Sequence, residues 1–239
     1  MTMILSALRW DVVVQGRNGF YWASAFLVVT IGALLLSVPD IARANPALWV
    51  PAILAINLQI TTFFFVAGLM LLERDEGTLN ALAVSPLSPA QYLAMRTLSL
   101  TGLAAVETMA IVWVGFGISG AWWLILAGTV ALGVIYTGFG AAIAVRYESV
   151  NALLLPASVF VGLLLLPLLP HFGLGPRLPF LVHPLEPPLT LLRAAYGGLD
   201  GNEIGYGLLG SLGWSAMAFG WGRHRVRLVM QNTSASGGR

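Results

Sequence analysis

Six long apolar stretches, each almost free of charged residues, recur along the sequence. A helix needs about 20 mostly apolar residues to cross the hydrocarbon core of a membrane. Each stretch reaches or approaches that length, and more polar segments separate them. The pattern therefore predicts an all-α, polytopic membrane protein in which a single transmembrane domain covers 1–239. The predicted transmembrane helices are 20–38, 49–72, 98–118, 121–145, 150–169 and 204–222.

The segment before the first predicted span has its own periodicity. Leu5, Leu8 and Val12 repeat at helical spacing, while Arg9 occupies another face. This pattern is typical of a helix that lies in the membrane interface, and a solvated leader is the alternative. We expect an interfacial helix over 1–18.

The longest segment outside the predicted spans, 170–203, mixes proline and charged residues with many apolar ones. A stretch this apolar seldom stays in water. The segment therefore predicts an extracellular re-entrant or lid region, with a purely structural cap as the alternative.

Composition and charge agree with a membrane protein and suggest its orientation. Of the 239 residues, 58% are hydrophobic and 9% are charged, whereas soluble domains carry roughly 25% charged residues. An even number of spans places both termini on one side. Nine of the 12 basic residues, all of them Arg, then fall on that side, and Arg43, Arg177 and Arg193 fall on the other. By the positive-inside rule, we expect a cell-membrane protein with both termini in the cytoplasm.

Several kinds of chemistry are excluded or unsupported. The chain has no Cys, which excludes disulfides and thiolate metal sites, and His171, His183 and His224 lack the spacing of a metal site. A P-loop requires a lysine that reaches the phosphates, and the chain has no Lys. We therefore expect no ATPase or other enzyme activity, no cofactor and no metal in this chain. The net charge of +2 gives no sign of a nucleic-acid partner.

The most informative polar segment, 73–92, connects the second and third predicted spans. Four charged residues end the membrane helix, Gly77 permits a sharp turn, and a Ser-Pro pair stops the short helix that follows. Ser88, Pro89 and Gln91 then form the pattern of a capping box at the start of the next helix. We predict a short cytoplasmic helix between two spans, which is either a plain connection or a docking surface. The residues singled out are Glu73, Arg74, Asp75, Glu76, Gly77, Thr78, Leu79, Leu82, Ser85 and Pro86.

This segment also carries a family resemblance. The run from Glu73 to Leu79, followed by the run from Val84 to Ser88, resembles the coupling segment of ABC-2 type exporter permeases. In that family, a Glu-Gly-Thr motif leads into a Ser-Pro turn that sits in a groove of the ATPase subunit. The leader 9–21 resembles the family's elbow helix, and 183–192 resembles its external re-entrant region. Small drug-export permeases, including those for fluoroquinolone efflux, look most similar.

The resemblance implies that the chain is the permease subunit of an ATP-binding cassette exporter for a drug-like or amphipathic substrate. The 73–92 segment would then couple it to a separate ATPase, present in two copies, which binds ATP and Mg²⁺. A second permease copy is also implied, and a homodimer is the default because symmetric oligomers are the commonest kind. Membrane lipid is the remaining partner.

One ionisable residue, Glu107, is predicted to lie deep in the membrane. Insertion scales assign a charge at such a depth a cost of about 2.5–3.5 kcal/mol, so the residue needs a partner or a wet cavity. Two interpretations remain open: Glu107 lines a pathway for cationic or zwitterionic cargo, or it is neutral and joins helices by hydrogen bonds. Asn57, Gln59 and Thr61 in the second predicted span are secondary pathway candidates, and such residues more often join helices.

Two other classes of function compete with the exporter. An ion-coupled secondary transporter would need more buried ionisable residues and inverted repeats, and neither is visible in the sequence. A membrane-embedded enzyme would need convergent Ser, His, Asp or metal ligands at one depth, and no such set is visible. The sequence leaves the substrate, the direction of transport and the choice between homodimer and heterodimer open.

Overall fold

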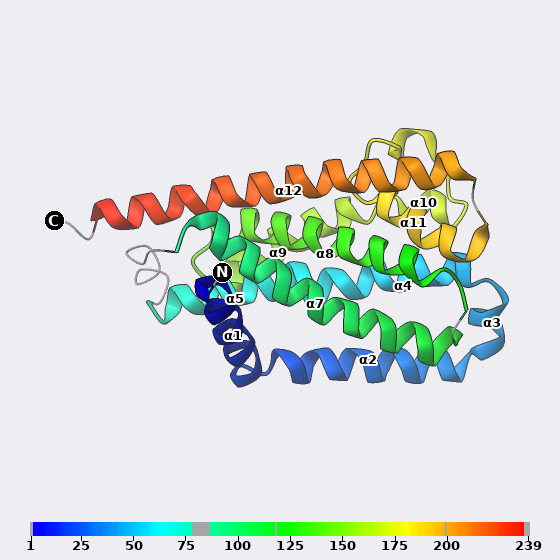
Figure 1. The fold of residues 1–239 in the computed structure, drawn as a ribbon, viewed down its shortest axis with the longest axis horizontal. Coiled ribbons are helices and arrows are strands. Elements are labelled where there is room, and N and C mark those ends of the chain that lie inside the picture. Colours follow the sequence, from blue (N-terminus) through cyan, green and yellow to red (C-terminus); the bar gives the residue numbers. More distant parts are fainter. Residues whose placement is uncertain (1, 78–86, 118, 199, 237–239) are drawn as a thin grey trace.

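The computed structural model describes residues 2–77, 87–117, 119–198 and 200–236, and this part of the chain forms helices, turns and loops with no strand. The all-α prediction is confirmed for these residues. The long helices run side by side in an elongated bundle, and α1 and the end of α12 lie toward the same end of it (Figure 1). In chain order, the elements are α1 Thr2–Arg17, α2 Phe20–Ser37, α3 Pro39–Ala44, α4 Pro46–Leu58, the π-helix η1 Gln59–Phe64, α5 Phe65–Asp75, α7 Pro89–Phe116, α8 Trp122–Ala144, α9 Val150–Leu164, α10 Leu168–His171, the 3-10 helix η2 Leu178–Phe180, α11 Glu186–Gly197 and α12 Gly201–Ser236.

Among the described residues, four helices are long and apolar enough to cross a membrane: α2, the continuous helix Pro46–Asp75, α7 and α8. The helices at the fifth and sixth predicted spans do not meet both the length and the hydropathy needed. Helix α9 has only 15 residues, and α12 is long but carries many glycine and serine residues, which lower its hydropathy. The predicted span 150–169 is interrupted: α9 ends at Leu164 and α10 begins only after Pro167, which has no N–H to continue the hydrogen-bond ladder.

Two helices extend beyond their predicted spans. The third predicted span begins at residue 98, and α7 begins at Pro89, where the capping-box pattern predicted the start of a helix. Its predicted capping box is confirmed: the Gln91 N–H donates to Ser88 Oγ at 3.2 Å, and the Ser88 N–H donates to Gln91 Oε1 at 2.9 Å. The last predicted span ends at residue 222, but α12 continues to Ser236. The Arg, Leu, Met and Gln residues of this extension favour a helix, so it continues beyond the apolar stretch.

The amino-terminal helix expected over 1–18 is present as α1, Thr2–Arg17. It runs across the long axis of the bundle, whereas α2 runs along that axis (Figure 1). Gly19 precedes α2 with a φ of 79°, a left-handed conformation that glycine adopts without strain, so the chain can turn sharply between the two helices. The interfacial position of α1 stays a prediction.

Helix α8 is the centre of the bundle, and it packs against α12, α11, α7, η1 and α5. Its glycines bring neighbouring backbones very close. A Cβ at Gly138 would lie 2.6 Å from the carbonyl of Ala218 in α12, and one at Gly140 would lie 2.7 Å from the carbonyl oxygen of Phe63 in η1. Such small-residue contacts are the usual means of close helix packing in membranes.

We expect Gly138→Ala to destabilise the protein by about 1–3 kcal/mol, because the added methyl group meets backbone atoms that cannot rotate away. Gly220→Ala in α12 is the matched control, since open space surrounds that position. Thermal unfolding of the detergent-solubilised protein checks the difference. Equal melting temperatures for the two variants would contradict the close α8–α12 contact.

Candidate functional site

The first candidate site is a buried charged cluster centred on Arg96 of α7, which is 1% exposed. Its Nη1 pairs with Asp11 Oδ1 of α1, and its Nη2 pairs with Glu73 Oε1 at the end of α5. One guanidinium thus joins carboxylates from two other helices. We call this set the Arg96 network, and its members are Asp11, Gln15, Glu73, Tyr92, Arg96 and Ser99.

Neutral donors satisfy the remaining carboxylate oxygens of the Arg96 network. Tyr92 Oη donates to Glu73 Oε2 at 2.5 Å. Gln15 Nε2 donates to Asp11 Oδ2 and to Ser99 Oγ, both at 2.9 Å, and Ser99 Oγ also donates to Asp11 Oδ2. A buried ion pair of this kind stabilises a fold only when additional hydrogen bonds satisfy the charged groups. The network therefore requires α1, α5 and α7 to be in place together.

The Arg96 network adjoins both ends of the predicted coupling segment. Glu73 and Arg96 bracket the residues between them, and Glu73 is buried in its ion pair rather than presented at the surface. Arg74 donates to the carbonyl oxygens of Tyr147 and Val145 at the end of α8. Asp75, Glu76 and Gly77 are exposed. The predicted residues Thr78, Leu79, Leu82, Ser85 and Pro86, with the short helix expected there, lie outside the described part of the chain.

The second candidate site, the Glu107 cluster, lies within the bundle. Glu107 is 2% exposed and accepts hydrogen bonds from three helical segments. Asn57 Nδ2 of α4 and Thr61 Oγ1 of η1 each donate to Glu107 Oε2 at 2.7 Å, and Ser24 Oγ of α2 donates to Glu107 Oε1. Asn57 and Thr61, which the sequence analysis named separately as secondary pathway candidates, thus both contact Glu107. The carboxylate joins α2 and the α4–η1 segment to α7.

A π-helical segment supplies part of the Glu107 cluster. Helix α4 passes into η1, Gln59–Phe64, before the α-helical pattern resumes at Phe65. Thr62 Oγ1 donates to the Leu58 carbonyl oxygen at 2.5 Å, and Thr61 Oγ1 contacts the Asn57 carbonyl oxygen at 3.4 Å. Side-chain hydroxyls therefore bond to the backbone where the helix widens. Segments of this kind occur frequently at functional sites.

The Glu107 cluster joins helices through hydrogen bonds, and two side-chain oxygens in or beside it have no hydrogen-bond donor. Three polar side chains converge on one carboxyl group, which is an arrangement that joins helices by hydrogen bonds. Asn57 Oδ1 and Gln59 Oε1 are buried with no hydrogen-bond partner among the described residues. Gln59 is therefore not joined to Glu107. An unpaired buried acceptor is costly, so these two oxygens are the unsatisfied polar atoms beside the cluster.

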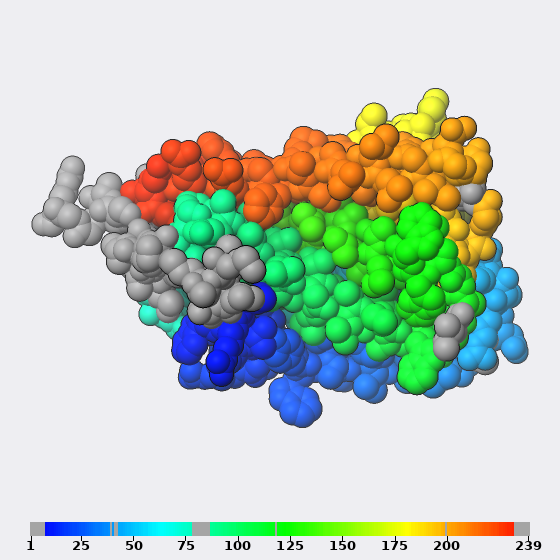
Figure 2. All heavy atoms as spheres, viewed as in Figure 1, coloured from blue at the N-terminus to red at the C-terminus, as the bar shows by residue number. Residues whose placement is uncertain are grey.

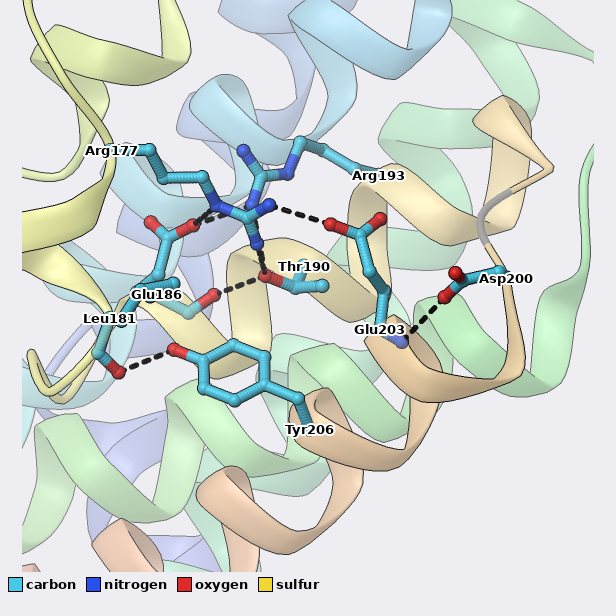
Figure 3. A network of polar contacts seen from close by, with 8 residues as sticks. All are labelled: Arg177, Leu181, Glu186, Thr190, Arg193, Asp200, Glu203 and Tyr206. Carbon is cyan, nitrogen blue, oxygen red and sulfur yellow. Dashed lines mark hydrogen bonds and ion pairs between the residues drawn. The ribbon is translucent and has the colours of Figure 1, made fainter.

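A third polar cluster lies around α11, within the predicted re-entrant region (Figure 3), and α11 is at the end of the bundle opposite to α1 (Figure 1). Glu186 of α11 is 1% exposed, and its Oε1 accepts from Arg177 Nε and from Arg193 Nη2. Arg177 Nη1 also donates to Glu203 Oε1 of α12 at 2.7 Å. Partial burial lowers the pKa of the Arg177 guanidinium, but its hydrogen bonds to Glu203 and Glu186 raise that pKa overall. The guanidinium is thus held charged between α11 and α12.

Sequence reasoning found Glu73, Glu107, Asn57 and Thr61 but missed several of their partners. The missed residues are Asp11, Gln15, Ser24, Tyr92, Arg96, Ser99, Arg177, Glu186 and Arg193 as cluster members. A local signal did exist for some of them, since Asp11 and Gln15, like Tyr92 and Arg96, stand four residues apart on one helix face. Pairing across helices leaves no such signal in a single sequence.

Comparison of the sequence with known proteins identifies a family. The family model described as "Fluoroquinolones export permease protein family" matches residues 2–226. The chain belongs to this family. Two relatives from Mycobacterium tuberculosis, strains CDC 1551 / Oshkosh and ATCC 25618 / H37Rv, are each named as a fluoroquinolones export permease protein. Each is 28% identical over 214 residues, which is 87% of this chain and 88% of the relative. No solved structure matches the chain.

Membership of the fluoroquinolones export permease protein family is consistent with a bundle of long apolar helices. The matched residues include the Arg96 network, the Glu107 cluster and the segment 170–203. Together with the four apolar helices long enough to cross a membrane, the membership makes the chain a membrane transport permease. The resemblance to small drug-export permeases noted in the sequence is confirmed.

We expect Thr61→Val to lower the stability of this export permease more than Thr62→Val does. Both threonines are fully buried. Thr61 donates to the Glu107 carboxyl group, whereas Thr62 donates to a backbone carbonyl of its own helix. A buried polar atom left without its hydrogen-bond partner costs about 1–3 kcal/mol. Thermal unfolding in detergent measures both variants, and equal losses would show that the Glu107 cluster does not clamp the helices.

We expect Arg96→Met to destabilise the export permease by about 3–5 kcal/mol, because it leaves two buried carboxylates without their counter-charge. The triple variant Asp11→Asn, Glu73→Gln, Arg96→Met removes all three charges and keeps similar volumes. It is expected to be clearly more stable than Arg96→Met alone. The same unfolding measurement compares them, and a triple variant that is no more stable than the single one would contradict the charge argument.

Proposed function

We propose that the chain is the permease subunit of an ATP-binding cassette exporter and is driven by a separate ATPase that docks on the 73–92 segment. The observation that carries the proposal is the Arg96 network, because its ion pairs fix both ends of that segment to the bundle. Membership of an export permease family supports it. So do the exposed Asp75 and Glu76, which stand where the segment leaves α5.

The proposal includes six membrane crossings. The four long apolar helices supply four of them. The fifth is α9 continued by α10, and the sixth is the apolar first half of α12. The common end of the two termini in Figure 1 supports an even number of crossings. In this arrangement, both termini and the coupling segment are cytoplasmic, and α10 and α11 belong to the external side of the cell membrane.

The ATPase is a different polypeptide in this proposal. The chain contains no Lys and therefore no P-loop, so ATP and Mg²⁺ bind to the partner, and this chain holds no cofactor. Two ATPase copies act on two permease copies, and a homodimer is the default arrangement. Closure of the ATPase pair on ATP moves the coupling segments, and the spans then change from inward to outward access.

The Arg96 network determines which parts move with the coupling segment. Because Arg96 binds both Glu73 and Asp11, a displacement of the end of α5 is transmitted to α7 and to α1 together. The motion therefore reaches the bundle through three helices rather than through one flexible loop. This gives the motor a rigid connection, which a solvated loop between two spans would not provide.

The proposed cargo is drug-like and amphipathic, in keeping with the printed names of the two relatives. Glu107 places one carboxylate in the bundle and favours a cationic or zwitterionic cargo. In the arrangement described here, its oxygens are occupied by Ser24, Asn57 and Thr61. Contact with cargo therefore requires α2 or the α4–η1 segment to separate from α7 during the cycle.

A pull-down from native membranes tests the ATPase partner. We expect a P-loop ATPase to co-purify with the natural chain in mild detergent. The paired variant Glu76→Arg, Leu79→Asp should reduce its recovery about tenfold, which corresponds to about 1.4 kcal/mol.

Glu148→Arg is the matched control for the charge reversal, because Glu148 is an exposed carboxylate in a different connection at the same predicted side. It should leave the recovery of the ATPase unchanged. Absence of any P-loop ATPase from the natural chain would overturn the exporter assignment. An equal loss with Glu148→Arg would overturn the docking site and leave the partner intact.

A further inference from the structure

A pocket of about 380 Å³ opens between the start of α7 and the extension of α12. The two segments lie beside one another at the end of the bundle that carries both termini (Figure 2). Polar and apolar side chains both line the pocket. Among them are Ser88, Ala90, Arg223, Arg227, Met230 and Gln231.

Two arginines dominate the charge of the pocket. Arg223 and Arg227 stand four residues apart on α12, so both side chains project from the same face toward the cavity. Like charges at this spacing repel one another. Neither arginine makes an ion pair within the described residues, in contrast to Arg96, Arg177 and Arg193.

The sequence supplies no carboxylate side chain to either wall of the pocket. No Asp or Glu occurs from 77 to 90, which covers the α7 wall and the segment before it, or from 204 to 239, which covers the whole of α12 beyond its first turn. The amino-terminal turn of α7 adds the positive end of a helix dipole to the same field. The two arginines and the cavity between them therefore favour an anion brought from outside the chain.

The position of the pocket narrows the choice of anion. Arg223 directly follows the last apolar stretch of α12, and Trp221 stands beside it, a residue type enriched at the membrane–water boundary. The lining also includes the apolar side chains of Met230 and Ala90. A lipid headgroup presents this combination of a phosphate and an apolar glycerol ester at this depth, and basic pockets between membrane helices bind such headgroups.

We propose that this pocket binds the phosphate headgroup of an anionic phospholipid. Arg223 and Arg227 donate to the phosphate oxygens, as guanidinium groups commonly do in charge-assisted pairs. Met230 and Ala90 contact the glycerol region. Because the pocket joins α12 to the start of α7, the bound lipid stabilises the contact between these two helices. The proposal depends on the membrane location of the chain and not on an ATPase partner.

Lipid retention by the detergent-solubilised full chain tests this proposal. Native mass spectrometry counts the phosphatidylglycerol and phosphatidylcholine that stay bound after exposure to an equimolar mixture. The natural chain should retain phosphatidylglycerol preferentially. Arg223→Gln and Arg227→Gln should each reduce that retention severalfold.

Arg225→Gln is the matched control, since it removes one charge from the same stretch at a residue that does not line the pocket. It should retain phosphatidylglycerol like the natural chain. Thermal unfolding gives a second measurement, in which added phosphatidylglycerol should raise the melting temperature of the natural chain and of Arg225→Gln but not of the two pocket variants.

Three results would overturn the proposal. Equal losses in all three variants would reduce it to a general surface-charge effect. Inorganic phosphate that stabilises the natural chain as much as phosphatidylglycerol does would identify a free anion instead of a lipid. Pocket variants that keep phosphatidylglycerol but lose a co-purifying protein would identify an acidic protein surface as the occupant.

Discussion

The guanidinium of Arg96, buried between the carboxylates of Asp11 and Glu73, is the interaction on which the arrangement of helices at the terminal end of the bundle depends. Two carboxyl groups share one guanidinium away from water, which is tolerable only because Tyr92, Gln15 and Ser99 supply further donors. Removing one helix would leave the others with an unpaired buried charge. The electrostatics therefore hold α1, which runs across the bundle, in a fixed relation to α5 and α7.

Helix α7 connects this network to the Glu107 cluster. Arg96 and Glu107 are separated by eleven residues, which is close to three full turns at about 3.6 residues per turn, so they lie on nearly the same face of α7. At the terminal end, this face binds α1 and α5, and deeper in the bundle it binds α2 and the α4–η1 segment. A rotation or tilt of α7 cannot change one cluster without straining the other. This shared face provides a direct mechanical connection between the exposed residues that follow Glu73 and the deep carboxylate.

The parts of this structure that the sequence predicted are those governed by local rules. The apolar stretches gave the approximate places of the long helices, and Ser88 and Gln91 correctly marked the start of α7. The break at Pro167 and the π-helical turn at Gln59–Phe64 depend on backbone details that hydropathy does not register. The partners of Arg96 lie far away in sequence, so no periodicity identifies them. Glu107 was recognisable by its depth alone, whereas its three donors required the packing of α2 and α4 against α7.

Two arginines at the terminal end of the bundle, Arg223 and Arg227, differ in environment from the arginines at the opposite end, and this difference bears on the charge asymmetry of the sequence. At the end with α11, Arg177 and Arg193 are paired with Glu186 and Glu203. Arg43 donates to the Gly115 carbonyl oxygen. These three arginines therefore interact with carboxylates or a carbonyl oxygen of the chain itself. At the end with the termini, Arg223 and Arg227 have no carboxylate side chain on the segments around them. The number of arginines at each end therefore understates the charge asymmetry between the two ends of the bundle. The positive charge available to lipid or to a protein partner is concentrated at the end with Arg223 and Arg227.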